Sequence, residues 1–125
     1  MSETQITFKE MCARFDVTPR TLRYYEYIEL LTPDKEGRTR SYGPREVARM
    51  VLILRGRRFG FSLEEIRQWL EIYGQKGTTA QLEIWVEQAD RQLEALSTQR
   101  QQLDESIAEL QQLRDEAAQT LRSLS

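Results

Sequence analysis

Apolar residues recur every three to four positions in five segments of the chain, and this spacing predicts a mainly α-helical protein. The predicted helices cover residues 6–15, 18–28, 44–59, 63–73 and 79–125. The first two are separated by so short a turn that they form a helix-turn-helix pattern. Between the second and third helices, two extended pieces at 30–33 and 38–42 flank a polar turn at 34–37 and predict a small hairpin.

The first two helices carry signals at their starts. Thr7 and Glu10 have the spacing of a capping box, in which each side chain bonds the backbone amide of the other residue. Thr18 can accept from the free amides of the second helix, and Pro19 suits its first position. Residues 16–17 therefore form the tight turn between the two helices.

The second helix presents two different faces, because successive residues are about 100° apart around a helix. One face carries Arg20, Arg23, Tyr24 and Tyr27, and the opposite face carries Leu22, Tyr25 and Glu26. Cations and phenols on a short helix suit the major groove of DNA, while the opposite face anchors a core. The alternative is an ordinary surface helix with solvated charges.

Further cations follow the second helix along the chain. The second extended piece alternates Arg38, Arg40 and Tyr42 on one side, which makes the hairpin a candidate wing against a phosphate backbone. The alternative is an exposed hairpin whose charges only aid solubility. Arg57 belongs to an arginine cluster at the end of the helix 44–59, where it suits either a phosphate contact or the helix dipole.

The last helix follows a predicted hinge at 74–78 and contains neither glycine nor proline. Its apolar residues repeat in heptads, in one series Leu82, Ala89, Leu96, Leu103, Leu110, Ala117 and Leu124 and in the other Val86, Leu93, Ile107 and Leu121. Arg100 and Arg114 interrupt the second series. This pattern predicts a coiled coil, and a helix so long needs a partner helix for its apolar stripe. A homodimer supplies one. The alternative is that the last third folds back over the first.

Charge and composition narrow the function. The net charge is −2, but residues 18–58 hold ten Lys/Arg against five Asp/Glu, so a basic segment precedes an acidic one. Cys12 is the one cysteine and histidine is absent, which excludes Cys/His zinc clusters, histidine-based triads and an internal disulfide. No run resembles a membrane span or a signal peptide, so we expect a cytoplasmic protein. Because cysteine and histidine ligands are scarce, we also expect no bound metal, and we expect no cofactor.

Several motifs occur together in a fixed order: TPRTLRYYE from Thr18, Leu31-x-Pro33, Arg40-x-Tyr42, and Arg57-x-x-Gly60-Phe61-Ser62-Leu63-x-Glu65-Ile66. Over residues 6–73 the chain resembles the MerR family of bacterial transcription regulators. The resemblance implies a winged helix-turn-helix DNA-binding domain at 1–73, followed by a long dimerisation helix that forms an antiparallel coiled coil between two subunits. It also implies binding to palindromic operators in promoters with an overlong spacer. Bending and undertwisting that spacer lets RNA polymerase engage both promoter elements.

The helix faces, the heptads and the resemblance together assign residues to two surfaces, and the resemblance itself covers Arg23, Tyr24, Arg40, Tyr42 and Arg57. The residues expected at double-stranded promoter DNA are Thr18, Arg20, Arg23, Tyr24, Tyr27, Arg38, Arg40, Tyr42 and Arg57; those expected in the dimer are Leu82, Val86, Ala89, Leu93, Leu96, Leu103, Ile107 and Leu110. Two positions depart from the family pattern: Asp16 stands where glycine is usual, and two residues instead of one separate Gly37 from Arg40. The segments EGRTRSY and LILRGRRFGFSLEEI are similar to a proteobacterial group that controls branched-chain amino-acid and acyl-CoA catabolism genes.

Other functions fit the sequence less well. A DNA-architectural or excisionase-like protein would use the same winged helix, and a coiled-coil adaptor would use only the long helix. An enzyme is disfavoured because no paired nucleophile and base is visible. Metal-responsive relatives carry cysteines around the long helix, whereas residues 74–125 contain neither cysteine nor histidine. Any effector is therefore expected to be a small organic metabolite, and Trp69, Tyr73 and Trp85 offer aromatic surface for it or simply pack.

Overall fold

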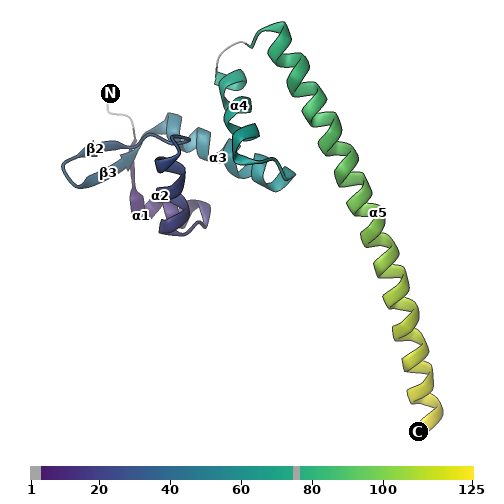
Figure 1. Cartoon of the computed structure of the whole chain (residues 1–125). Coiled ribbons are helices and arrows are strands. Elements are labelled where there is room, and N and C mark those ends of the chain that lie inside the picture. The colour runs from purple at the N-terminus through teal and green to yellow at the C-terminus, as the bar shows by residue number, and fades with distance from the viewer. Residues whose placement is uncertain (1–3, 75–76) are drawn as a thin grey trace. The chain divides into compact units, whose positions relative to one another are not determined.

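The computed structural model describes residues 4–74 and 77–125, without the side chains of 73 and 74. Its elements are β1 (Ile6–Thr7), α1 (Phe8–Phe15), α2 (Pro19–Tyr27), β2 (Asp34–Glu36), β3 (Thr39–Tyr42), α3 (Pro44–Phe59), α4 (Leu63–Gly74) and α5 (Thr79–Leu124) (Figure 1). The chain divides into two compact units, Met1–Leu82 and Glu83–Ser125. The predicted fold class, a mainly α winged helix-turn-helix followed by a long helix, is confirmed.

The helix-turn-helix forms as its caps predict. Thr7 and Glu10 bond each other's backbone amides at 3.1 Å and start α1. Asp16 ends α1 in the left-handed conformation, at φ 52°, and its amide donates to the Cys12 carbonyl. An aspartate therefore makes the turn for which glycine is usual in the family, since short polar residues tolerate this conformation better than most. The Thr18 hydroxyl then caps α2 by accepting from the Thr21 amide at 3.1 Å.

A three-stranded antiparallel sheet, in the order β1-β3-β2, differs from the predicted hairpin. Ile6 belongs to a strand that pairs with Tyr42, whereas the sequence had placed it in the first helix. The first hairpin strand is Asp34–Glu36, and the turn consists of Gly37 and Arg38. The prediction of a strand at 30–33 was wrong, because its leucines are buried in the core. The turn lies at Gly37, whose positive φ of 62° suits a two-residue hairpin turn.

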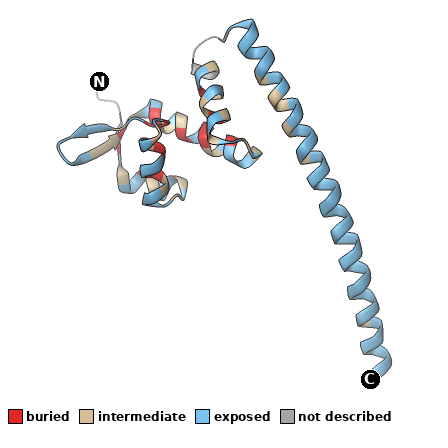
Figure 2. Ribbon diagram, viewed as in Figure 1, coloured by how far each residue is buried: buried red, intermediate tan, exposed pale blue. Residues whose placement is uncertain are grey.

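Helices α1, α2, α3 and α4 all contribute residues to the core of the first unit (Figure 2). Its fully buried side chains are Met11, Leu22, Leu30, Leu31, Tyr42, Met50, Ile53 and Ile66. At the crossing of α3 and α4, Gly56 lies against Ile66 so closely that a Cβ atom there would be 2.8 Å from Ile66 Cγ1. The backbones of the two helices approach each other at this point because Gly56 has no side chain.

Partly buried polar contacts hold the segment between α2 and β2. The Thr32 amide donates to the Glu46 carboxylate at 2.9 Å, and Glu46 is the buried charged residue of α3. The Arg67 guanidinium on α4 donates to the Ile28 carbonyl at the end of α2. Glu29 follows in the left-handed conformation, with φ 63°. The position of α2 therefore depends on side chains from both α3 and α4.

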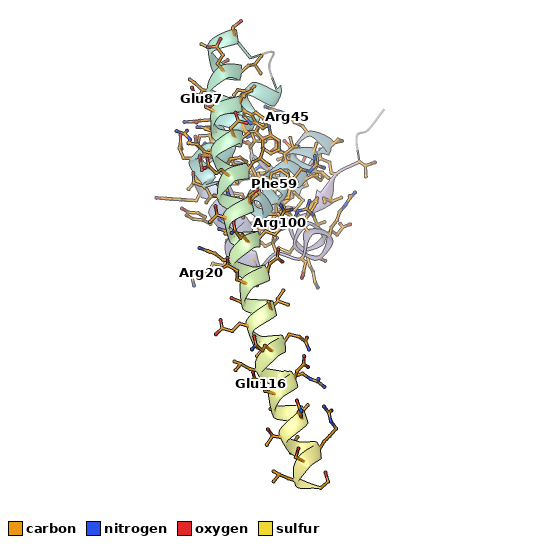
Figure 3. All side chains as sticks on the ribbon, turned by 90° about the vertical axis from the view of Figure 1, so that its right-hand side faces the viewer. Arg20, Arg45, Phe59, Glu87, Arg100 and Glu116 are labelled. Carbon is orange, nitrogen blue, oxygen red and sulfur yellow. The ribbon has the colours of Figure 1, made fainter. Side chains whose placement is uncertain are left out.

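Helix α5 is one unbroken helix of 46 residues, about 69 Å long at ~1.5 Å per residue. The alternative in which its last third folds back is wrong. None of its residues is buried in the single chain, and labelled side chains such as Glu87, Arg100 and Glu116 stand out along its length (Figure 3). Of the predicted hinge 74–78, residues 75–76 lie outside the described part. Within the described residues, no helix is both long and apolar enough to cross a membrane.

Candidate nucleic-acid interface

The exposed face of α2 carries the side chains that its spacing predicted. Tyr24 and Tyr27 are 49% and 83% exposed, whereas Leu22 and Tyr25 on the opposite face are 0% and 4% exposed. The predicted rotation of this helix is therefore confirmed. The core holds α2 by its apolar face and leaves its arginines and two phenols in solvent.

A shallow hollow of about 490 Å³ extends this face of α2 to α3. Its lining comprises Arg20, Thr21, Arg23, Tyr24, Tyr25, Tyr27, Arg57 and Leu63. Arg57 lies in the last turn of α3, far from α2 in the sequence. The structure thus brings three predicted arginines, Arg20, Arg23 and Arg57, to one surface. Arginine is suited both to phosphate oxygens and to guanine edges.

The ring of Phe8 links α2 to the wing. Arg23 of α2 lies over this ring with its guanidinium carbon 5.5 Å from the ring centroid, and Arg40 of β3 lies at 5.7 Å. Both distances allow a cation–π attraction. Phe8 was predicted only as an apolar residue of the first helix. It therefore restricts the positions of two cations from different elements.

Arg40 has a second contact, with the carboxylate of Glu26. The Arg40 Nε atom lies 3.5 Å from Glu26 Oε1, and the Tyr42 hydroxyl donates to the other oxygen of Glu26. Burial and the neighbouring Glu26 carboxylate raise the pKa of Tyr42 far above its ordinary value, so this phenol stays protonated. Glu26 thus couples α2 to strand β3.

The prediction that Tyr42 contacts DNA was wrong. Its side chain is 0% exposed, because Tyr42 pairs with β1 and points into the core while its hydroxyl reaches Glu26. Strand alternation correctly placed Tyr42 on the same side as Arg40, but that side faces inward at this end of the strand. A side chain with no exposed surface cannot read or contact DNA in this conformation.

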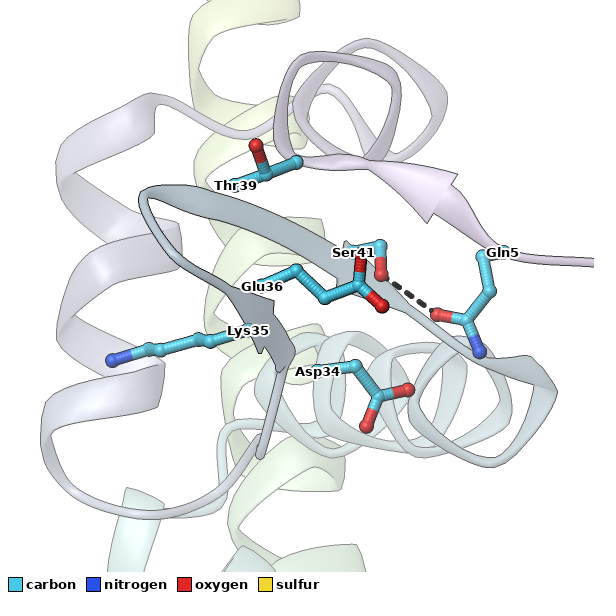
Figure 4. Close-up of a pocket in the computed structure, with 6 residues that line it drawn as sticks. All are labelled: Gln5, Asp34, Lys35, Glu36, Thr39 and Ser41. Carbon is cyan, nitrogen blue, oxygen red and sulfur yellow. Dashed lines mark hydrogen bonds between the residues drawn. The ribbon is translucent and has the colours of Figure 1, made fainter.

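The two faces of the wing differ in charge. One face carries Asp34, Glu36, Thr39 and Ser41, and the Ser41 hydroxyl donates to Gln5 Oε1 at 2.9 Å (Figure 4). Its carboxylates would repel a phosphate backbone. On β2, Lys35 pairs with Arg40 of β3 and extends away from Asp34 and Glu36 (Figure 4). The Lys35–Arg40 face is therefore the cationic one.

Lys35 is a candidate DNA contact that the sequence interpretation missed. The interpretation had assigned residue 35 to the turn, where its partner across the hairpin is undefined. The signal was present in Gly37, because a two-residue turn at Gly37 and Arg38 places Lys35 opposite Arg40. Arg38 lies exposed in this turn instead of in the strand. Thr18 uses its hydroxyl on Thr21, so its contribution to a DNA surface remains a prediction.

The described residues offer little for other kinds of site. No group of three or more metal-ligating side chains occurs among residues 4–74 and 77–125. Burial raises the pKa of the Cys12 thiol, which keeps it in its less reactive protonated form. Of the aromatic residues considered for an effector, Trp69 packs against the core, and the side chain of Tyr73 lies outside the described part.

Two family models match the sequence. The model described as "MerR HTH family regulatory protein" matches residues 6–72, and the model described as "MerR, DNA binding" matches residues 47–119. The HTH-type transcriptional regulator HmrR of Rhizobium leguminosarum bv. viciae is 33% identical over 106 residues, which are 84% of this chain and 75% of that protein.

Solved structures have the same fold. A MerR-family transcriptional regulator from Bacillus cereus matches with a TM-score of 0.67 and 29% identity, over 84% of this chain and 76% of that one. HiNmlR, described as a MerR family regulator lacking the sensor domain and bound to promoter DNA, matches with a TM-score of 0.63 over 83% of this chain and 79% of that one. At 18% identity, the second match concerns the fold alone.

Proposed function

The chain belongs to the MerR family of DNA-binding transcription regulators and is not an enzyme, and from this premise we propose that it binds a promoter operator as a homodimer. Each copy would place the exposed face of α2 in a major groove. The two-fold symmetry of the dimer would match a palindromic operator, with the spacing of the half-sites set by the dimer.

The observation that carries this proposal is the continuous cationic surface of α2 and α3. Arg20, Arg23 and Arg57 line one hollow with Tyr24 and Tyr27. Among the described residues, no aspartate or glutamate lines this hollow. We assign base contacts to the α2 side chains and backbone contacts to Arg57. Lys35 and Arg40 on the wing would contact phosphates beside the same half-site.

The second half of the proposal concerns α5. Several of its heptad leucines are more than half exposed in the single chain, among them Leu93 at 61%, Leu103 at 61% and Leu110 at 67%. Burying such a stripe against a second copy would remove it from water and stabilise both helices. The two joined heads would then bend and undertwist the promoter spacer, so that the regulator acts on RNA polymerase indirectly through the shape of the DNA.

Operator binding tests the proposal directly. An operator is first selected from random duplexes with the purified full chain, and its affinity is then measured across salt concentrations. Arg23→Ala should cost about 1–3 kcal/mol if Arg23 reads a base, and Arg57→Ala should lower the salt slope by about 1. Arg91→Ala on α5 is the matched control. Unchanged affinity and slope in both variants of the head would refute the assignment.

We further propose that the regulator senses neither soft metals nor thiol oxidation. Copper(I), mercury and zinc prefer sulfur or imidazole ligands. The 125-residue sequence contains one cysteine, Cys12, and no histidine. Its effector would be a small organic metabolite such as an acyl-CoA, or the protein would act without one. In vitro transcription with each metal and with an oxidant, compared with Cys12→Ser, tests this. A stoichiometric response to one metal would contradict it.

A further inference from the structure

Thr21 lies beside the face of α2 that we assign to DNA, although it belongs to neither of the two faces that the sequence distinguished. It is the third residue of α2 and is half-buried. Around the helix it is about 60° from Tyr24, between the exposed face and the buried one. Thr21 lines the same hollow as Arg20, Arg23 and Tyr24. Its side chain is therefore placed to contact a ligand that occupies this hollow.

Two hydrogen bonds with Thr18 orient the side chain of Thr21. The Thr18 hydroxyl oxygen accepts from the Thr21 amide at 3.1 Å, and the same hydroxyl donates to Thr21 Oγ1 at 3.0 Å. A threonine hydroxyl has one hydrogen to donate and two lone pairs that accept. Because Thr21 Oγ1 is the acceptor in this bond, its own hydrogen is left for another partner.

Threonines within α5 use their hydroxyls in a different way. Thr98 donates to the Glu94 carbonyl at 3.1 Å, and Thr120 donates to the Glu116 carbonyl at 3.0 Å. A bond to the carbonyl four residues earlier occupies the hydroxyl hydrogen inside the helix itself. In the described part of the chain, the Thr21 hydroxyl bonds Thr18 instead of such a carbonyl. Its hydrogen therefore stays available at the surface of the hollow.

From this geometry we infer that Thr21 reads a thymine in each operator half-site. Its hydroxyl would donate to thymine O4, and its methyl group would pack against the C5-methyl group of the same base. The inference rests on the proposed operator binding and deepens it by assigning one base to one side chain. Thr18 is the positioning residue, because its hydroxyl fixes the orientation of Thr21.

The chemistry of the major groove favours thymine over the other three bases. Thymine presents an acceptor, O4, beside a methyl group, and threonine presents a donor beside a methyl group. Cytosine presents an amino donor at the corresponding position, so a second donor gains no bond there. Guanine and adenine present acceptors without a methyl group. Thymine thus complements both groups of the threonine.

The place of Thr21 along α2 also suits a base contact. In helix-turn-helix proteins the N-terminal residues of the helix in the major groove contact base edges. Thr21 lies in the first turn of α2, directly after Arg20. Its side chain is short, so it contacts a base only where the helix backbone approaches the groove closely. A contact of this kind depends on a few atoms, which makes it sensitive to small changes on either side.

Two substitutions separate the donor from the methyl group. Thr21→Val keeps a methyl group and removes the donor, whereas Thr21→Ser keeps the donor and removes the methyl group. On the operator selected with the original full chain, Thr21→Val should weaken binding about three- to tenfold, and Thr21→Ser about threefold. Thr98→Val is the matched control, because Thr98 is an exposed helical threonine of α5, and it should leave affinity unchanged. Thermal unfolding checks that all three variants remain folded.

Modified bases identify the atoms that Thr21 contacts. Each thymine of the half-site is replaced in turn by uracil, which lacks the C5-methyl group, or by 5-methylcytosine opposite guanine, which has an amino group in place of O4. At one position the original chain should lose about threefold with uracil and about threefold or more with 5-methylcytosine. There Thr21→Ser should lose nothing further with uracil, and Thr21→Val should lose much less than the original chain with 5-methylcytosine. Each variant already lacks the group that the modified base no longer matches.

The outcomes separate this inference from the proposed function. If the original chain selects no operator, the proposed function itself fails. If it selects one and both Thr21 variants keep the original affinity, the inference is overturned. An equal loss on every modified operator would show a phosphate contact, and coupling at a base other than thymine would show a different reading. Either result overturns the assignment, whereas coupling of both variants to the same thymine supports it.

Discussion

At the scale of single residues, the candidate DNA surface depends on side chains that would not touch DNA. Phe8 lies under the guanidinium groups of both Arg23 and Arg40, and Glu26 receives Arg40 on one oxygen and Tyr42 on the other. An arginine has many rotamers, and holding it before binding lowers the entropy lost on binding. Phe8 and Glu26 are therefore positioning residues for this surface.

Phe8→Leu tests that role. The change keeps an apolar side chain of similar size, so we expect a loss of stability below about 1.5 kcal/mol but a clear loss of operator affinity. Phe15→Leu is the matched control, because Phe15 lies on the same helix. The guanidinium carbon of Arg14 lies 5.9 Å from the centroid of its ring. Thermal unfolding and operator titration measure the two effects. Equal affinity losses in both variants would contradict the positioning role.

The backbone at Glu29 provides a second prediction at this scale. Glu29 has φ 63°, a conformation that costs residues with a side chain about 1–2 kcal/mol. Glycine removes this cost, but its greater freedom in the unfolded chain costs about 0.5–1 kcal/mol, so Glu29→Gly should stabilise the fold by up to about 1.5 kcal/mol. Urea unfolding measures it. Asp16→Gly is the comparison and should gain less, because aspartate tolerates this conformation better.

At the scale of elements, α2 is positioned by its neighbours as much as by its own sequence. Its caps define where it starts, but Arg67 of α4 holds the carbonyl at its end, and Arg57 of α3 extends its exposed face. Helices α3 and α4 must therefore cross at a defined distance for the candidate DNA surface to form. Gly56 sets that distance against Ile66.

Gly56→Ala should disturb this crossing. The new methyl group would lie 2.8 Å from Ile66 Cγ1, within the fully buried core. Overpacking of this kind typically costs about 1–3 kcal/mol, of which better helix propensity offsets roughly 1 kcal/mol. Denaturant unfolding gives the net value. Ile66→Ala supplies the double-mutant cycle, and a purely additive cycle would show that the two sites do not clash.

At the scale of the whole molecule, the proposed function requires two copies. The exposed stripe of α5 has no cover in the single chain, and one head alone would read only one half-site. The heptad leucines of α5 would join the two copies, and only a dimer would contact both half-sites. Operator binding would therefore depend on dimerisation.

Replacing Leu93 and Leu96 by glutamate should therefore give monomers and abolish operator binding together. Charged groups at two adjacent layers cannot be buried without a large desolvation cost. Sedimentation measures the mass, and circular dichroism checks that the head is still folded. Glutamate at the outward position Gln101 is the control. A variant that binds the operator tightly as a monomer would contradict the prediction.

The sequence by itself determined the features that depend on residues close together in the chain. The caps at Thr7 and Thr18, the faces of α2 and the long apolar stripe of α5 all follow from spacings of three, four or seven residues. Helix periodicity is a local property, so it can be predicted without knowing the neighbours in space.

The tertiary structure alone decided how distant segments meet. Tyr42 is buried because it pairs with β1 and bonds Glu26, which lies 16 residues earlier. Lys35 joins Arg40 through the register of the hairpin, and Arg57 joins α2 through the packing of α3. Strand alternation says which residues share a side, but not which side faces the core. That choice depends on long-range packing, and here it turned a predicted DNA contact, Tyr42, into a core residue.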